Sequence, residues 1–85
     1  MYSLEYSVQA ARFLKKCDKD LCERITHKIQ NLKETPVPSD AKFMGRHHSD
    51  KVFRIRIGDY RALYKIKENE KIVLIAKIDK RPRAY

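Results

Sequence analysis

Residues 52–66 read VFRIRIGDYRALYKI, and this stretch has the pattern of two β-strands joined by a tight turn. Apolar side chains alternate with basic ones on both sides of Gly58-Asp59, a dipeptide typical of a two-residue hairpin turn. With that turn, Arg56 lies directly opposite Arg61. The hairpin is therefore predicted to have one apolar face and one face that carries arginine side chains.

The same register places Arg54 on the arginine-bearing face, diagonal to Arg61, so three guanidinium groups converge there. Like charges opposite each other destabilise a sheet. An anion such as phosphate, held by bidentate guanidinium contacts, would make the arrangement favourable. The alternative is that the arginines point into solvent, with Asp50 or Asp59 nearby as partial counter-charges. The opposite face, where helices are expected to pack, carries Phe53, Ile55, Ile57, Ala62 and Tyr64.

The segments on either side extend this sheet. Residues 67–70, KENE, form a polar loop, and residues 71–78 that follow, which are apolar except for Lys71 and Lys77, predict a central strand. Upstream, Leu4 and Tyr6 alternate with polar residues, which predicts a first strand over residues 2–7. Apolar side chains recur at helical spacing over residues 10–17 and again over residues 22–32, which predicts two consecutive helices.

Capping residues mark where these helices begin and end. Ser7 is the predicted N-cap of the first helix, and Asp20 with Glu23 has capping-box spacing for the second. The prolines at positions 36 and 38 end the second helix near Glu34. Residues 37–51 are then a long connection. The predicted fold is α+β, a single domain over residues 1–85: a small antiparallel sheet in the order β-α-α-β-β-β, with a helical hairpin packed on one face.

The charge of the chain is concentrated in its second half. The protein has 85 residues and a formal net charge of +9, with a pI of about 9.8. Residues 1–41 carry seven basic and six acidic side chains, whereas residues 42–85 carry thirteen basic and five acidic ones. A half-chain with a net charge of +8 is typical of a protein that binds a polyanion, most commonly nucleic acid. A solvated basic surface is the alternative.

Other features argue against membrane and metal functions. The longest apolar run is five residues, 72–76, far short of the ~20 that span a bilayer. The N-terminus lacks the basic and apolar regions of a signal peptide, so we expect a cytoplasmic protein with no membrane partner. Cys17 and Cys22 are expected to be reduced core residues. His47 and His48 could complete a metal site only on paper, so we expect no metal and no cofactor.

The stretch quoted above, followed by IVLIAKIDKRPRAY at residues 72–85, resembles the RelE toxins of the RelE/ParE superfamily. The resemblance implies the toxin of a type II toxin–antitoxin system. It further implies a metal-independent, ribosome-dependent endoribonuclease that cleaves mRNA by attack of the substrate's 2′-hydroxyl and so inhibits translation. The implied partners are a cognate RelB-type antitoxin, the ribosome and mRNA.

The resemblance also implies which residues do the chemistry. The positions that match the active site of the RNA-cleaving branch are Arg54, Arg56, Arg61, Arg81 and Tyr85. Basic residues expected to contact RNA or the ribosome are Lys42, Arg46 and Lys51 in the connection, and Lys80 and Arg83 near the C-terminus. Some members carry lysines at positions 54 and 56. Arginine loses a proton less readily than lysine, so the resemblance assigns no general base here.

Two other functions share parts of this pattern. The first is a gyrase inhibitor like the ParE branch of the superfamily, which has the same fold but generally lacks the full set of basic active-site residues. The second is a plain RNA-binding module that uses the basic face without chemistry. The combination of four arginines and a tyrosine favours the nuclease.

Overall fold

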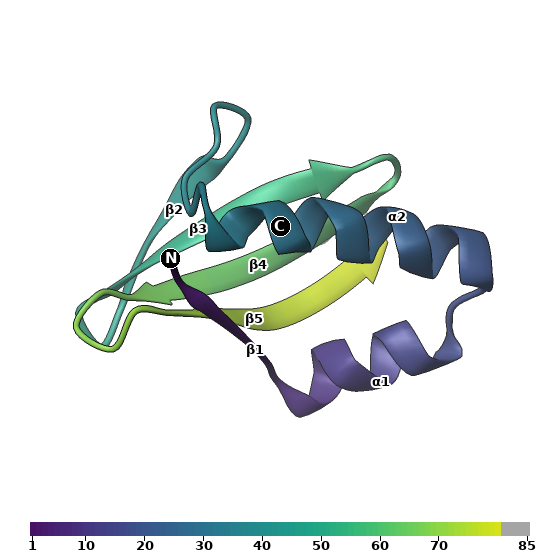
Figure 1. Cartoon of the computed structure of the whole chain (residues 1–85), viewed down its shortest axis with the longest axis horizontal. Coiled ribbons are helices and arrows are strands. Elements are labelled where there is room, and N and C mark those ends of the chain that lie inside the picture. Colours follow the sequence, from purple (N-terminus) through teal and green to yellow (C-terminus); the bar gives the residue numbers. More distant parts are fainter. Residues whose placement is uncertain (81–85) are drawn as a thin grey trace.

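The computed structural model of the chain describes residues 1–80. Within them two helices pack on one face of a five-stranded sheet (Figure 1). The elements in chain order are β1 (Ser3–Tyr6), α1 (Val8–Lys16), α2 (Lys19–Gln30), the 3₁₀ turn η1 (Asn31–Lys33), β2 (Lys42–His47), β3 (Asp50–Ile57), β4 (Tyr60–Lys67) and β5 (Ile72–Lys80). The strands lie in the order β1-β5-β4-β3-β2. The predicted α+β class and the helical hairpin are confirmed.

The β3–β4 hairpin has the register that its sequence predicts. Ile57 pairs with Tyr60, and Arg56 pairs with Arg61. Gly58 takes a φ of +60° at the first position of the turn, a conformation that residues with a Cβ rarely adopt. Alternate residues of both strands are buried, namely Phe53, Ile55 and Ile57 of β3 and Ala62, Tyr64 and Ile66 of β4, so the alternation of apolar and basic residues does separate two faces of the sheet.

Two features of the sheet differ from the prediction. Residues 37–51 are not only a connection, because they contain the edge strand β2. The sheet is also mixed rather than purely antiparallel, since β1 pairs in parallel with β5. β2 has only one neighbouring strand and is largely exposed, so it lacks the alternating apolar residues by which a strand is recognised. The direction of β1 depends on a pairing with a strand almost seventy residues away, for which the chain carries no local signal.

The helix caps are partly as predicted. Ser7 is the N-cap of α1, and its hydroxyl accepts a hydrogen bond from the Ala10 N–H at 3.1 Å. The N-cap of α2 is Asp18, not Asp20: its carboxylate accepts from the Leu21 N–H at 2.9 Å. Asp20 instead lies in the first turn, where its negative charge interacts favourably with the positive end of the helix dipole. The helical segment ends in η1 at Lys33, one residue before the predicted end.

The core lies between the helices and the sheet. Its fully buried members include Ile25 and Ile29 of α2, and Ile55, Tyr64 and Ile75 of the sheet. The Tyr64 hydroxyl donates a hydrogen bond to the Pro36 carbonyl oxygen at 2.7 Å, and burial raises the pKa of that hydroxyl. This bond fastens the segment after η1 to the centre of the sheet.

The cysteines lie at the rim of the core rather than inside it. Cys17 and Cys22 are free and half-buried where α1 meets α2. Burial raises the pKa of the Cys17 thiol, and the neighbouring Cys22 adds to the effect. Within residues 1–80, no helix is both long and apolar enough to cross a bilayer.

Candidate functional site

The sheet face that the helices leave open carries Arg54, Arg56 and Arg61, and we call it the arginine face. Arg56 and Arg61 are directly opposed across β3 and β4, and Arg54 pairs with Leu63 on the same face. Arg54 and Arg61 are half-buried, whereas Arg56 is exposed. The Arg56 Nε donates to the Gly58 carbonyl oxygen at 3.4 Å, which holds this guanidinium beside the turn. The three arginines therefore project from the same open face of the sheet, as the sequence predicts.

Strand β2 brings a further cation to the arginine face. Lys42 pairs with Arg54, so the two side chains project from the same side of the sheet. A β-bulge follows at Met44, because Phe43 pairs with Phe53 whereas Gly45 already pairs with Val52. The bulge reverses the alternation of β2, and Arg46 is turned to the helix side as a result.

Three other cations predicted to bind RNA, namely Arg46, Lys51 and Lys80, do not lie on the arginine face. Arg46 pairs with Lys51, which pairs with Ile66, a core residue on the helix side of β4. Lys80 pairs with Tyr60, and the Tyr60 ring packs against Phe13 of α1. The position of Lys80 therefore also lies on the helix side of the sheet. Arg46 and Lys51 line a hollow together with the carboxylates of Asp50, Glu68 and Glu70. A hollow with both signs of charge is less suited to a polyanion than the arginine face.

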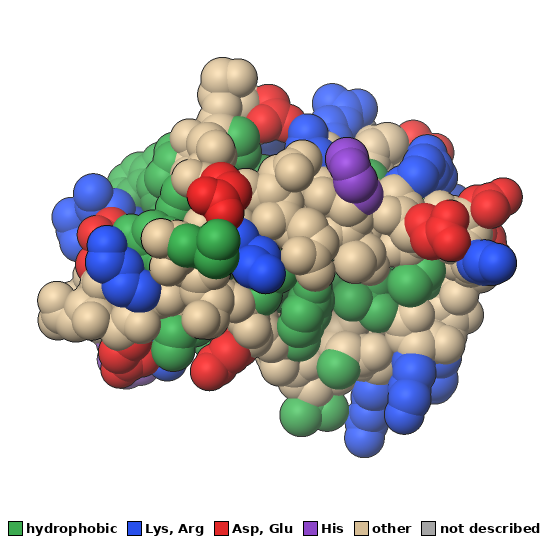
Figure 2. Space-filling view, viewed as in Figure 1, with side chains coloured by type: hydrophobic (Ala, Val, Ile, Leu, Met, Phe, Trp, Pro, Cys, Tyr) green, Lys and Arg blue, Asp and Glu red, His purple; other side chains and the backbone are tan. Residues whose placement is uncertain are grey.

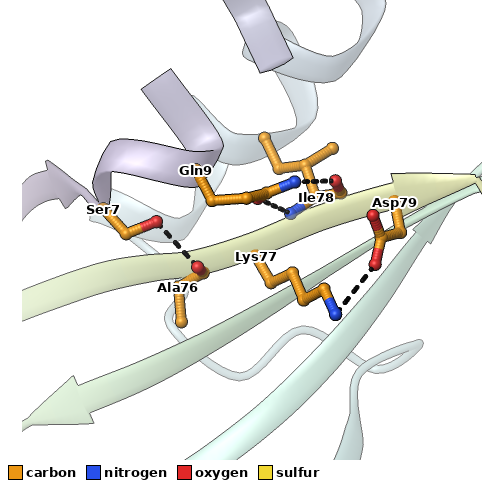
Figure 3. Close-up of polar contacts among 6 residues, drawn as sticks. All are labelled: Ser7, Gln9, Ala76, Lys77, Ile78 and Asp79. Carbon is orange, nitrogen blue, oxygen red and sulfur yellow. Dashed lines mark hydrogen bonds and ion pairs between the residues drawn. The ribbon is translucent and has the colours of Figure 1, made fainter. Parts of the chain in front are cut away.

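Strand β5 contributes to the arginine face because it contains a second bulge. Leu63 pairs with Lys77 whereas Tyr64 pairs with Ile75, so Ala76 is an extra residue. The alternation of β5 reverses at this point, and Ile75 and Ile78 are both fully buried although they are three residues apart. Lys77 and Asp79 are thereby turned onto the arginine face, where Asp79 lies directly opposite Arg61. The Lys77 Nζ and the Asp79 Oδ2 form an ion pair at 3.3 Å (Figure 3).

Side chains from the start of α1 hold this bulge. The Ser7 hydroxyl donates to the carbonyl oxygen of Ala76 at 2.7 Å. The Gln9 amide makes two hydrogen bonds with the backbone of Ile78, both at 2.9 Å (Figure 3). Beyond Tyr6, where β1 ends, these two side chains thus take over as the neighbours of β5.

The arginine face continues toward the β2–β3 turn. The Lys65 Nζ lies 3.0 Å from the Nδ1 of His47, whose ring stands edge-on to that of His48 at a centroid separation of 4.2 Å. His48 and Ser49 have φ values of 52° and 74°, a strained conformation for residues with side chains. The sequence interpretation missed Lys77 and Asp79, because their positions on this face follow from the bulge in β5. It also left out Lys65, although the predicted register of β3 with β4 already places that residue on this face.

The helix side of the molecule has a different character. Figure 2 shows this side, where basic and acidic side chains are interspersed around the helices. Within residues 1–80, no group of three or more His, Cys, Asp or Glu side chains is arranged to hold a metal ion. The catalytic candidates Arg81 and Tyr85, and the binding candidate Arg83, lie outside the described residues.

A helical hairpin on one face of a sheet and clustered arginines on the other define a small α+β domain with a cationic sheet surface. The chain matches the family described as "ParE toxin of type II toxin-antitoxin system, parDE" over residues 4–85. It therefore belongs to this family of toxins, within the RelE/ParE superfamily.

Relatives with the name RelE align over nearly the whole chain. A Methanocaldococcus jannaschii protein named RelE1 is 29% identical over 85 residues, covering 99% of this chain and 94% of the relative. A chain of the archaeal RelE–RelB complex from Pyrococcus horikoshii superposes with a TM-score of 0.85 at 27% identity, covering 98% of both chains. The RelBE2 toxin–antitoxin complex from Mycobacterium tuberculosis gives a TM-score of 0.76 at 26% identity, covering 94% of this chain and 98% of the other.

Proposed function

We propose that this toxin is an endoribonuclease that cleaves mRNA on the ribosome and thereby inhibits translation. The observation that carries the proposal is the convergence of Arg54, Arg56 and Arg61 on the open face of the sheet. A structural role does not require such an arrangement, because opposed like charges destabilise a sheet. A phosphodiester bound at this face would satisfy the guanidinium groups.

The proposed reaction requires no metal. The 2′-hydroxyl oxygen of the RNA attacks the adjacent phosphorus in line, and the 5′-oxygen leaves. The pentacoordinate intermediate gains negative charge, which fixed guanidinium groups stabilise, each such donor typically contributing about 10²–10³ in rate. The ribosome contributes by holding the message in position, which converts a loose encounter into a nearly intramolecular reaction.

Arg81 and Tyr85 belong to the proposal through the family resemblance alone. Arg81 would donate a further hydrogen bond to the phosphate, and Tyr85 would either stack on a base or share a proton. Substitution distinguishes the two roles of Tyr85. If it stacks, Tyr85→Phe keeps most activity while Tyr85→Ala loses about 1–3 kcal/mol of substrate interaction; if its hydroxyl transfers a proton, both variants lose activity alike.

The proposed regulator is a RelB-type antitoxin. The P. horikoshii and M. tuberculosis neighbours were each solved as toxin–antitoxin complexes, and both are more than 25% identical to this chain. A partner that neutralises a cationic face is expected to be rich in Asp and Glu, and to fold as it wraps this small domain. Because its target is the ribosome, the toxin would act in the cytoplasm.

A gyrase inhibitor is the second candidate, because the matching family takes its name from ParE. The two candidate functions predict different effects in the cell: cleaved messages for the nuclease, and inhibited DNA supercoiling for the gyrase inhibitor. We would induce the toxin in cells, map message ends by primer extension, and measure the supercoiling activity of purified gyrase with the purified toxin.

The proposal requires new message ends within codons, and requires purified ribosomes for cleavage in vitro. Intact messages together with inhibited supercoiling would favour the gyrase inhibitor. Binding without either effect would leave a plain RNA-binding module.

A further inference from the structure

The arginine face needs a group that accepts a proton, and its arginines do not supply one. A guanidinium is always protonated in proteins and has no acceptor. If the proposed cleavage occurs, the attacking 2′-hydroxyl must lose its proton to some other group. The inference below therefore rests on the proposed function.

Asp79 is the carboxylate that the fold places among the arginines. It lies opposite Arg61 on β4, and Arg61 lies opposite Arg56 on β3, so these three residues form one row across the sheet. Its side chain keeps 31% of its surface exposed, and its Oδ2 is 3.3 Å from the Nζ of Lys77. The carboxylate is therefore held by a neighbour and is still open to a substrate.

Two other carboxylates on this face, Asp50 and Glu5, lie farther from the arginine row. Asp50 is six residues from Arg56 along β3, or about 20 Å at the rise of a strand. Glu5 pairs with Leu74, and Leu74 pairs with Lys65, so Glu5 lies in the same row as Lys65. Lys65 is four residues from Arg61 along β4, which places that row about 13 Å from the arginine row. Asp79 is thus the strand carboxylate that lies beside Arg61 in the arginine row, whereas Asp59 lies in the exposed β3–β4 turn, beyond the last paired row of the two strands.

The bulge in β5 is what places Asp79 there. Without the extra residue Ala76, the alternation that buries Val73 and Ile75 would continue and would turn Lys77 and Asp79 into the core. The bonds from Ser7 and Gln9 hold the bulged conformation. Bulges of this kind often re-aim a side chain beside an active site.

We propose that the Asp79 carboxylate is the general base of the cleavage reaction. It accepts the proton of the RNA 2′-hydroxyl as the bond from O2′ to phosphorus forms and the bond from phosphorus to O5′ breaks. The 5′-oxygen takes a proton from water, and Asp79 returns its proton to solvent. The products are a 2′,3′-cyclic phosphate and a 5′-hydroxyl. Within residues 1–80, the charged neighbours of Asp79 on this face are Lys77 on its own strand and Arg61 on β4, with Arg56 of β3 next in the same row; all three are cations, whereas Gln9 of α1 is neutral.

The test compares Asp79→Asn with wild type in single-turnover cleavage of an end-labelled message bound to purified ribosomes. A general base contributes about 10²–10⁴-fold, so the variant should cleave more slowly by that factor. Binding of a message with a 2′-deoxynucleotide at the cleavage position should stay equal or become tighter, because a negative charge is removed from a cationic face. Glu5→Gln, which removes another carboxylate from the same face, is the matched control and should cleave at the wild-type rate.

The pH dependence separates a proton acceptor from a structural counter-charge. Carboxylates are deprotonated above about pH 6, so the wild-type rate should be nearly flat between pH 6 and 8. Asp79→Asn must rely on hydroxide and should therefore gain about tenfold per pH unit. A variant rate within threefold of wild type, or a slower rate that stays flat with pH, overturns the inference.

Two further outcomes remain informative. If Asp79→Asn does not fold, Asp79→Ala serves instead: it should show the same loss of rate and the same rise with pH, whereas a rate within threefold of wild type overturns the proposal. If the wild-type protein leaves the message intact on ribosomes, the proposed function itself is wrong. That result is distinct from a failure of the variant alone, and it removes this inference as well.

Discussion

The side chain of Gln9 takes the place of a strand residue beside Ile78. Its Nε2 donates to the Ile78 carbonyl oxygen and its Oε1 accepts from the Ile78 N–H, both at 2.9 Å. β1 ends at Tyr6, so without Gln9 these two backbone groups of β5 would have no partner from the first strand. A helix residue thus completes the sheet at the point where β5 turns Asp79 toward the arginines.

Replacing Gln9 with alanine should destabilise the protein. A buried or half-buried polar group that loses its partner costs about 1–3 kcal/mol, although water can recover part of this at an exposed edge. Gln9→Ala should therefore lower the free energy of unfolding, measured by urea titration, by about that amount. Gln30→Ala, a change of the same size at an exposed position of α2, should have little effect. Equal stabilities of the two variants would contradict the role given to Gln9.

Much of this fold is encoded in local patterns. The alternation in residues 52–66 and the turn at Gly58-Asp59 were sufficient to predict the register of β3 with β4, and with it the opposition of Arg56 and Arg61. Helical spacing predicted both helices, and Ser7 was recognised as a cap because a side-chain oxygen before a helix has a local partner. Each of these signals lies within a few residues of the structure it specifies.

The missed features depend on distant contacts. The edge strand β2 has almost no apolar alternation, so only its pairing with β3 identifies it. The bulge at Ala76 cannot be recognised in the sequence, because it lies in an apolar run in which either set of alternate residues could face the core. For this reason the alternative without a ligand named only Asp50 or Asp59 as partial counter-charges, and it missed Asp79, which the structure places opposite Arg61.

Lys42 and Lys51 are a matched pair that tests which face binds RNA. Both are exposed lysines of the β2–β3 hairpin, but their register places Lys42 on the arginine face and Lys51 on the helix side. Binding to single-stranded RNA should weaken with salt at a log–log slope of about −0.7 for each phosphate contacted. Lys42→Ala should make that slope shallower by about one such contact, measured by fluorescence anisotropy, and Lys51→Ala should leave it unchanged. The reverse result would place the RNA on the helix side.

The ion pair between Lys28 and Asp40 should give the protein a small pH-dependent stability. The hydrogen bond from the Lys28 Nζ to the Asp40 Oδ2, at 2.6 Å, lowers the pKa of that carboxyl below its ordinary value of 3.8. A carboxyl with a lowered pKa stabilises the fold above the unfolded-state value, and the effect is lost as the pH falls through the folded-state value. Because both side chains are more than one-third exposed, the contribution should be below about 1 kcal/mol and sensitive to salt.

Asp40→Asn isolates this contribution. The variant should lose slightly less stability than wild type when the pH is lowered from 7 to 3, as measured by thermal unfolding at low salt. The difference should shrink when salt is added, since the pair is screened. A difference that persists in high salt would point to a cause other than this ion pair.

Arg56 and Arg61 should act as one unit in the proposed reaction. Each is expected to donate to the developing charge on phosphate, so Arg56→Ala and Arg61→Ala should each lose about 2.7–4 kcal/mol of transition-state stabilisation, or 10²–10³ in rate. The two residues are directly opposed, so the double variant should lose less than the product of the single losses. Arg24→Ala, on the exposed surface of α2, is the matched control and should cleave normally.

Alanine substitutions in the Arg56–Arg61 pair should lower the cleavage activity without lowering the stability of the fold. Arg56 is exposed and opposes a like charge, so its removal relieves repulsion and should leave the free energy of unfolding unchanged or slightly higher. Urea unfolding of each variant beside single-turnover cleavage on ribosomes measures both quantities. An inactive Arg56→Ala variant that is as stable as wild type would mean that the arginine serves the reaction and not the fold. An inactive variant that is also unfolded would mean that the opposed arginines belong to the structure, since a functional anion site tolerates the loss of its cation without collapse.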